Sequence, residues 1–168
     1  MTHFTGSLLA FALLAAAATV GCGPGVEFAP RTDSGDSVDL TIGDKTVRAE
    51  LALDDETRRD GLMWRTEIAE NSGMLFGYDT AKKLNFWMKN TAVPLSIAFI
   101  SDEGEILQIE HMEPHVERRT LSKMDVRFAL EMNKGWFERN GIAVGSRIGN
   151  FKEVIENLPI RREDAPVR

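Results

Sequence analysis

The chain has 168 residues, of which 20 are basic and 26 acidic, so its formal net charge at pH 7 is −6. This balance argues against a nucleic-acid-binding protein, which would carry a basic stripe or patch, and against adhesion to an anionic membrane through surface charge. The single cysteine allows no intramolecular disulfide.

Residues 1–21 are predicted to be a signal peptide. A run of small and apolar residues at 8–20 is too short to span a bilayer comfortably and matches the core of such a peptide. The run ends in Thr-Val-Gly-Cys, which is typical of a lipoprotein cleavage box, so we expect Cys22 to be lipidated and to anchor the protein to a membrane of the cell envelope. Two acyl chains anchor stably, because each buried methylene contributes about 0.8 kcal/mol. The alternative is ordinary secretion, with cleavage near Ala18 and an unpaired thiol.

Three further segments follow the signal peptide. Residues 22–36 are rich in Gly, Pro, Ser and Asp and hold too few aliphatic side chains to offset the entropy lost on ordering, so we expect a flexible tether. The charged segment 160–168 is expected to be disordered for the same reason. Residues 37–159 are predicted to form a single β-rich domain, with a core large enough to fold without disulfides.

The domain alternates apolar and polar residues with the period of two that is typical of β-strands. Residues 38–42 and 47–53 are predicted to form a hairpin about the Gly-Asp turn between them. A short helix is predicted next, at residues 55–63, with Asp54 or Asp55 as its N-cap.

The rest of the domain is predicted to be mostly strand. Residues 134–140 should form one or two helical turns that end at Gly141. Many short strands with little helix indicate an all-β fold, namely a compact β-sandwich or barrel-like domain with one main helix and one short helix. The remaining predicted strands are residues 73–78, 84–89, 95–101, 105–112, 126–132 and 144–151.

Five motifs occur in order along this domain: Gly-Leu-Met-Trp-Arg at 61–65, Gly-Met-Leu-Phe at 73–76, Phe-Trp-Met-Lys-Asn-Thr at 86–91, Pro-Leu at 94–95 and Glu-Met-Asn-Lys-Gly at 131–135. Together they closely resemble the prokaryotic family catalogued as domain of unknown function 192, over about residues 38–155. The resemblance implies a compact β-sandwich that is often secreted or lipid-anchored, and it implies no particular activity. The chain departs from the family pattern at Ser96, where an aspartate is usual, and at His115, where a cysteine is frequent.

A dense polar cluster inside a strand-like segment, residues 85–95, indicates a site. Alternation places Trp87 and Lys89 on one face. A lysine can lay its stem along a tryptophan ring and present its ammonium group to an anionic ligand. Together with Asn90 and Thr91, these side chains are predicted to bind a ligand. The structural alternative is an edge strand, in which Trp87 covers the end of the sheet and Lys89 prevents edge pairing.

Arg65 and Glu131 are expected to lie near this cluster. Arg65 would add a second cation for an anionic ligand. Glu131 is expected on the polar face of a strand whose other face is apolar. If Glu131 pairs with Lys89 across strands, the pair is either structural, worth under about 1 kcal/mol when exposed, or, in a desolvated cleft, a binding or acid–base couple.

No metal, cofactor or nucleophile is predicted. His111 and His115 share a face of an extended chain, but their Cα atoms would lie roughly 13 Å apart, and no third ligand clusters with them. The chain has no Gly-x-Ser-x-Gly elbow and no phosphate-binding glycine loop, and its serines lack an obvious base partner in the sequence.

The sequence therefore predicts a lipid-anchored envelope domain that acts as a binding or accessory module for a polar or anionic ligand, such as an envelope glycan or peptide. Two alternatives stay open. One is an envelope hydrolase or lyase, with Glu131 as general acid–base and Lys89 as stabilising charge. The other is a purely structural domain. An enzyme needs Glu131 and Lys89 in one concave pocket, whereas a structural motif would bury both in packing or separate them.

Replacing Cys22 by serine tests the anchor. The hydroxyl cannot form the thioether that carries the lipid, so the Cys22→Ser protein should leave the membrane fraction, as measured by immunoblotting of sedimented and soluble material. A variant that still sediments with membranes after its signal peptide has been cleaved would contradict the lipoprotein interpretation.

Overall fold

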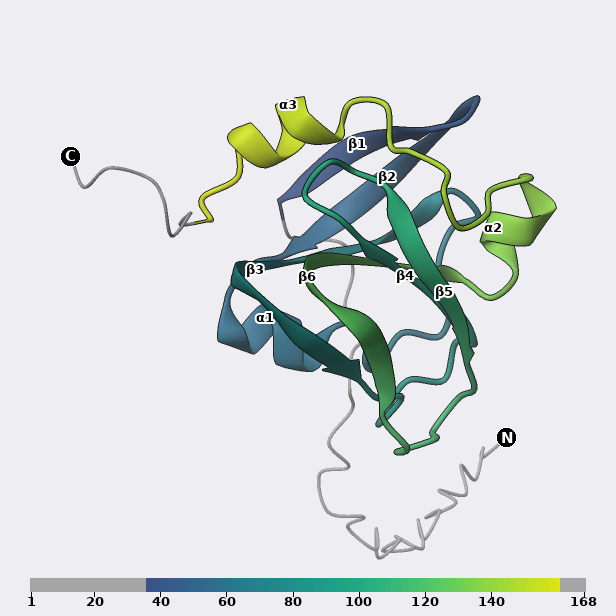
Figure 1. Cartoon of the computed structure of the whole chain (residues 1–168). Coiled ribbons are helices and arrows are strands. Elements are labelled where there is room, and N and C mark those ends of the chain that lie inside the picture. Colours follow the sequence, from purple (N-terminus) through teal and green to yellow (C-terminus); the bar gives the residue numbers. More distant parts are fainter. Residues whose placement is uncertain (1–35, 161–168) are drawn as a thin grey trace, which may run out of the picture.

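The alternating segments of the sequence form six strands of one sheet (Figure 1). This computed structural model describes residues 36–160, so the predicted signal peptide, Cys22, nearly all of the tether and residues 161–168 lie outside the described part. None of the helices in residues 36–160 has the length and hydropathy needed to cross a membrane. The elements are β1 (Ser37–Ile42), β2 (Lys45–Ala52), α1 (Asp55–Asp60), β3 (Ser72–Phe86), β4 (Leu95–Ile100), β5 (Ile106–Met112), β6 (Thr120–Asn133), α2 (Trp136–Arg139) and α3 (Phe151–Glu156).

The strands lie in the order β1-β2-β3-β6-β4-β5, and every neighbouring pair is antiparallel except β2 and β3. Parallel neighbours need a crossover connection, which here is the segment 53–71 that contains α1. The predicted hairpin and the predicted capped helix are both confirmed. Asp54 is the N-cap, and its carboxylate accepts hydrogen bonds from the backbone N–H groups of Glu56 and Thr57, each at 2.9 Å. The helix ends earlier than predicted, because the chain turns at Gly61 with a φ of 49°.

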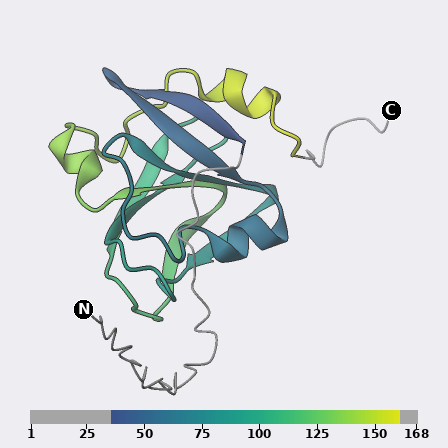
Figure 2. The ribbon, with the colours of Figure 1, turned by 180° about the vertical axis from the view of Figure 1, so that it is seen from behind.

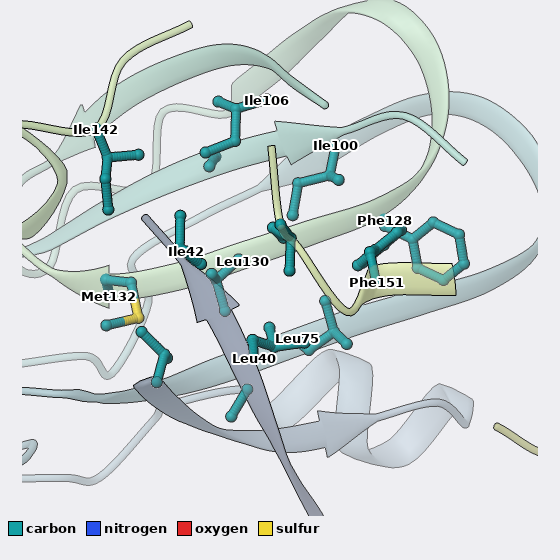
Figure 3. Packing of buried hydrophobic residues seen from close by; sticks show 14 of the residues in the cluster. Leu40, Ile42, Leu75, Ile100, Ile106, Phe128, Leu130, Met132, Ile142 and Phe151 are labelled. Atoms are coloured by element: carbon teal, nitrogen blue, oxygen red, sulfur yellow. The ribbon is translucent and has the colours of Figure 1, made fainter. Parts of the chain in front are cut away.

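Two apolar clusters lie on opposite faces of the sheet. The inner cluster receives side chains from all six strands and from α2 and α3; its members include Leu40, Val47, Leu75, Ala98, Ile106, Leu130, Trp136 and Phe151 (Figure 3). The outer cluster lies on the α1 side and includes Ala52, Leu62, Phe76, Phe86, Ile97, Phe99 and Ala129. Figures 1 and 2 show α1 and α3 on opposite sides of the sheet. Because both faces are covered, the middle strands are buried on both sides, and every residue of β4 is buried.

The prediction of a compact all-β domain is confirmed: its strands form one six-stranded mixed sheet, with three short helices instead of two in the described residues. The predicted strand at 144–151 does not form. This segment instead makes two isolated bridges, Ile148 to Ile42 next to one edge of the sheet and Arg147 to Glu105 next to the other. It ends where Phe151 packs edge-on against Phe128, with ring centroids 5.1 Å apart, and begins α3.

β3 is one continuous strand of 15 residues, where two strands were predicted. Its pairing with β6 is interrupted after Gly77, where residues 78–81 have no partner on β6, and resumes at Lys82 with a further irregularity before Asn85. The strand ends at Phe86. Trp87 and Lys89 therefore lie in the loop that follows, and the alternation assumed for them does not apply.

A substitution at Gly73 tests how closely the backbones of β3 and β6 approach each other. A Cβ atom at this position would lie 2.2 Å from the backbone oxygen of Glu131 and 2.5 Å from the sulfur of Met132. We expect Gly73→Ala to lower the free energy of unfolding by about 1–3 kcal/mol in urea titrations, because the overpacked strands must separate. Gly149→Ala is the matched control, because its Cβ would meet only the Thr41 oxygen, at 3.7 Å. Equal effects of the two substitutions would contradict this account.

Candidate functional site

The sequence had suggested that Glu131 lies on a solvated face of its strand. In the structure it lies instead in the outer apolar cluster. In β6 it is flanked by Met74 of β3 and Ile97 of β4, both buried. Only 4% of its surface is exposed. The prediction of a polar face was wrong because the α1 crossover and the loop after β3 cover this side of the strand.

Glu131 differs from the other buried polar side chains in its lack of a partner. Within residues 36–160, the buried polar side chains are Thr91, Ser96, Gln108, Ser122 and Glu131. The first four form hydrogen bonds with the protein. No hydrogen bond or ion pair to the Glu131 carboxyl group is formed by this part of the chain. An unpartnered buried carboxylate is very unfavourable, so the group is expected to take up a proton instead.

The burial of Glu131 raises the pKa of its carboxyl group from the ordinary value of 4.5 to about 8. Desolvation is the cause, since the charged form loses its water and gains no compensating partner. At neutral pH the group is therefore mostly a neutral carboxylic acid, which can donate one hydrogen bond and accept others.

A small cavity of about 20 Å³ lies against this carboxyl group. Such a volume is large enough for one water molecule or one ligand group of similar size. Its lining includes Arg58, Arg59 and Asp60 of α1, Leu62, Phe86, Trp87, Thr91 and Leu95.

A wider groove of about 330 Å³ adjoins the cavity and shares Arg58, Arg59, Phe86 and Trp87 with it. The rest of its lining is Asp55, Tyr78, Lys82, Lys83, Leu84, Asn85 and Arg119. Of the eleven residues that line the groove, five are basic and one is acidic, so the groove is locally positive although the chain carries a net negative charge.

Two aromatic rings of the groove each carry two cations. The Lys89 ammonium lies 5.2 Å from the centroid of the Trp87 ring, and the Arg119 guanidinium lies 4.2 Å from it. The Tyr78 ring likewise has Arg58 at 4.7 Å and Lys82 at 4.6 Å. Because cations already lie against its faces, Trp87 positions charge and does not offer an open stacking platform.

Three of these cations have no carboxylate partner within the described residues. They are Lys82, Lys89 and Arg119, of which Arg119 donates only to the neutral Asn85 Oδ1, at 3.1 Å. Arg58 differs, because it pairs with Asp55 at 2.7 Å and also donates to two backbone carbonyl groups.

The other predicted site residues have mainly structural contacts. Asn90 has a left-handed φ of 54°, and its carbonyl group accepts a hydrogen bond from the backbone N–H of Trp64 at 2.9 Å. Thr91 is buried and donates to the Lys89 carbonyl at 3.2 Å, while its surface lines the small cavity. Arg65 lines neither space. It forms a bidentate ion pair with Glu50, with both N–O distances at 2.5 Å. Glu50 belongs to β2 and lies opposite Met74 of β3.

The structure separates Lys89 from Glu131. Lys89 is exposed over Trp87 and does not line the cavity beside Glu131. The structure also adds Tyr78, Lys82 and Arg119, which the sequence reasoning missed. The basic pairs Lys82-Lys83 and Arg118-Arg119 are the only local signal that could have indicated two of them.

Ser96 has a base partner in the structure that was not evident in the sequence. Its Oγ lies 2.8 Å from His111 Nδ1, and His111 Nε2 lies 3.3 Å from a carboxylate oxygen of Glu138. A nucleophile must be accessible, but Ser96 is fully buried and also accepts a hydrogen bond from the Gly135 N–H. The chain of contacts therefore ties α2 to β4 and β5. Within the described residues, no group of three or more His, Cys, Asp or Glu side chains is placed to hold a metal ion.

Comparison with known proteins identifies the family. Residues 38–149 match domain of unknown function 192, which is described as "Uncharacterized ACR". The chain belongs to this family. The five sequence motifs had indicated the same assignment, which the match confirms. No curated protein matches the chain.

Two solved structures are similar to this member of the family. A candidate transcription regulator from Sinorhizobium meliloti 1021 is 36% identical, with a TM-score of 0.62, and the match covers 66% of this chain and 89% of that one. A protein of unknown function from Novosphingobium aromaticivorans DSM 12444 is 30% identical, with a TM-score of 0.61 and coverage of 67% and 82%. Both similarities support the fold.

The pH dependence of stability tests the burial of Glu131. Between pH 4.5, the ordinary pKa expected in the unfolded chain, and about pH 8 in the folded chain, the folded state holds one more proton. Stability should therefore fall as the pH rises through this window, by about 3–5 kcal/mol in total, and level off above it. Urea unfolding between pH 4 and 9 measures this fall.

Glu131→Gln, which is neutral at every pH, should remove most of this slope and be more stable than the wild type at pH 8. The matched control is Glu156→Gln, at an exposed position of α3, which should leave the slope in place. A slope that persists in Glu131→Gln would show that other groups cause it.

Proposed function

We propose that this protein is a lipid-anchored binding or accessory module of the cell envelope whose groove beside α1 and β3 binds an anionic ligand. The observation that carries the proposal is the set of cations without carboxylate partners within the described residues: Lys82 and Arg119 line the groove and lie against the Tyr78 and Trp87 rings, and Lys89 lies against the same Trp87 ring outside the lining. The anchor at Cys22 is the expectation drawn from the sequence.

The way these cations are held supports a binding role. A surface lysine or arginine is normally mobile, and it loses side-chain entropy when a ligand immobilises it. Contact with the Trp87 and Tyr78 rings reduces that loss, because the cation is already positioned. An anionic glycan or peptide of the envelope has the charge that such a groove would attract.

An envelope hydrolase or lyase is the second candidate, and the protonated Glu131 favours it, because a general acid must hold its proton near neutral pH. The position of Lys89 outside the cavity of Glu131 weighs against the pairing that this mechanism requires. Turnover of a bound ligand would favour the enzyme, whereas saturable binding without turnover would favour the binding module.

Removal of single groove charges tests the proposal. We expect Arg119→Gln and Lys82→Gln each to weaken binding of an anionic trisaccharide, trigalacturonate, by about tenfold, the value of one charge-assisted hydrogen bond. Isothermal titration calorimetry of the purified chain measures this effect, with maltotriose as the neutral ligand that should bind weakly or not at all.

Lys45→Gln is the matched control. Lys45 lies at the start of β2, outside the groove, and pairs with its neighbour Asp44 at 3.2 Å, so its loss should leave the affinity unchanged. Equal losses in all three variants would indicate a general effect of net charge. Failure of the wild type to bind both trigalacturonate and the anionic peptide triglutamate would remove the proposal.

A further inference from the structure

The small cavity and the wide groove form two adjoining spaces of opposite character. They share Arg58, Arg59, Phe86 and Trp87, so the two spaces lie side by side. The groove is rich in cations, whereas the cavity borders the outer apolar cluster and the one buried polar side chain without a partner in residues 36–160.

The size and chemistry of the cavity restrict what can enter it. A space of about 20 Å³ accepts a single group the size of a water molecule. A protonated Glu131 offers one O–H donor and a carbonyl acceptor, and a hydroxyl group can satisfy both at once. An anionic group is a poorer match than a hydroxyl group, although Arg58 and Arg59 share the cavity lining with Asp60, because an anion has no proton to donate to the carbonyl oxygen of the Glu131 acid.

We propose that the cavity is an inner subsite in which the Glu131 carboxyl group binds one hydroxyl group of the ligand, and that the ligand is a hydroxylated anion of the sugar-acid class. Its hydroxyl group occupies the cavity, and its charge lies in the groove near Lys82 and Arg119. This inference rests on the proposed function and specifies the chemistry of its ligand.

Binding of such an anion is linked to the protonation of Glu131. Loss of the proton removes the donor and adds a negative charge beside the anion, so affinity should fall by up to tenfold for each pH unit above the pKa of about 8. Other groups near this carboxyl are Arg58, Arg59 and Asp60 of α1 and Tyr78 of β3. On the same face of the sheet, Glu50 of β2 pairs with Arg65 on the far side of Met74, and the residue of β4 opposite Glu131 is the apolar Ile97. The pKa of Tyr78 is raised by burial, so this residue keeps its proton throughout the window.

The experiment compares two probes of equal charge from pH 6 to 9, trigalacturonate, which carries hydroxyl groups, and triglutamate with an acetylated N-terminus and an amidated C-terminus, which carries none on its side chains. Calorimetric titration of the full chain at pH 6, 7, 8 and 9 should show tighter binding of trigalacturonate and a fall of its affinity above pH 8. Glu131→Gln should keep this preference and lose the fall, because its amide both donates and accepts at every pH. Glu131→Met should lose about three- to tenfold in affinity for trigalacturonate alone, the value of one hydrogen bond.

Glu156→Gln is the control for the change of net charge, and a thermal melt confirms that each variant is folded at the temperature of titration. A second readout is independent of affinity. Carboxyl carbon NMR of Glu131 should show a higher pKa with trigalacturonate bound than without it, because the ligand prefers the protonated form.

Equal affinity of the wild type for both probes, unaffected by Glu131→Met, would overturn the inner subsite and leave the anion-binding groove intact. The same holds if a pH dependence of binding persists in Glu131→Gln, or if the NMR pKa does not move on binding. Absence of binding for both probes would overturn the proposed function as well, so the two failures are distinguishable.

Discussion

The burial of the second half of β6, Phe128 to Met132, on both faces is the physical constraint from which the sheet and the site follow. β6 pairs with β3 on one side and with β4 on the other, so its side chains alternate between the inner and the outer apolar cluster. Phe128, Leu130 and Met132 fill the inner cluster. A slip of one residue would move all three to the other face, so the register is strongly fixed. That register also fixes the place of Glu131, whose carboxyl group cannot move to bulk water without breaking the pairing of the central strand.

The outer face accommodates two glutamates in two different ways. The partly buried Glu50 forms a bidentate ion pair with Arg65. Glu131 has no such partner within the described residues and is held largely as the neutral acid at pH 7. A buried ion pair is usually a structural feature, whose replacement by apolar residues can even be neutral. A neutral acid beside an open cavity has a hydrogen-bonding capacity that the fold leaves unused, and such capacity is typical of a binding site.

Local sequence signals predicted the local structure well. The hairpin of β1 and β2 follows from alternation on both sides of a Gly-Asp turn, and the start of α1 follows from the capping side chain of Asp54. The burial of Glu131 could not be predicted in this way, because Arg127, Ala129 and Glu131 alternate with an apolar set as they would on a solvated face. Their cover comes from the α1 crossover and the loop after β3, which are distant in sequence.

The groove was only partly predictable for the same reason. Trp87 and Lys89 are close in sequence, and their contact was expected from the motif that contains them. Arg119 contacts the same ring from the position directly before β6, and Lys82 contacts Tyr78 from the middle of a strand that was predicted to be interrupted there. Pairing between β3 and β6 brings these segments together, and a single sequence contains no direct signal of that pairing.

The contrast between the positive groove and the net charge of −6 has a consequence for how an anion would approach the protein. At low ionic strength, the Debye length is about 30 Å, so an incoming anion is exposed to the repulsion of the whole molecule before it meets the groove. At physiological ionic strength, the Debye length of about 8 Å screens that repulsion, while the cations on Trp87 and Tyr78 still act at contact distance. Moderate salt should therefore speed the association of an anion with this groove, the reverse of what a uniformly basic surface would do.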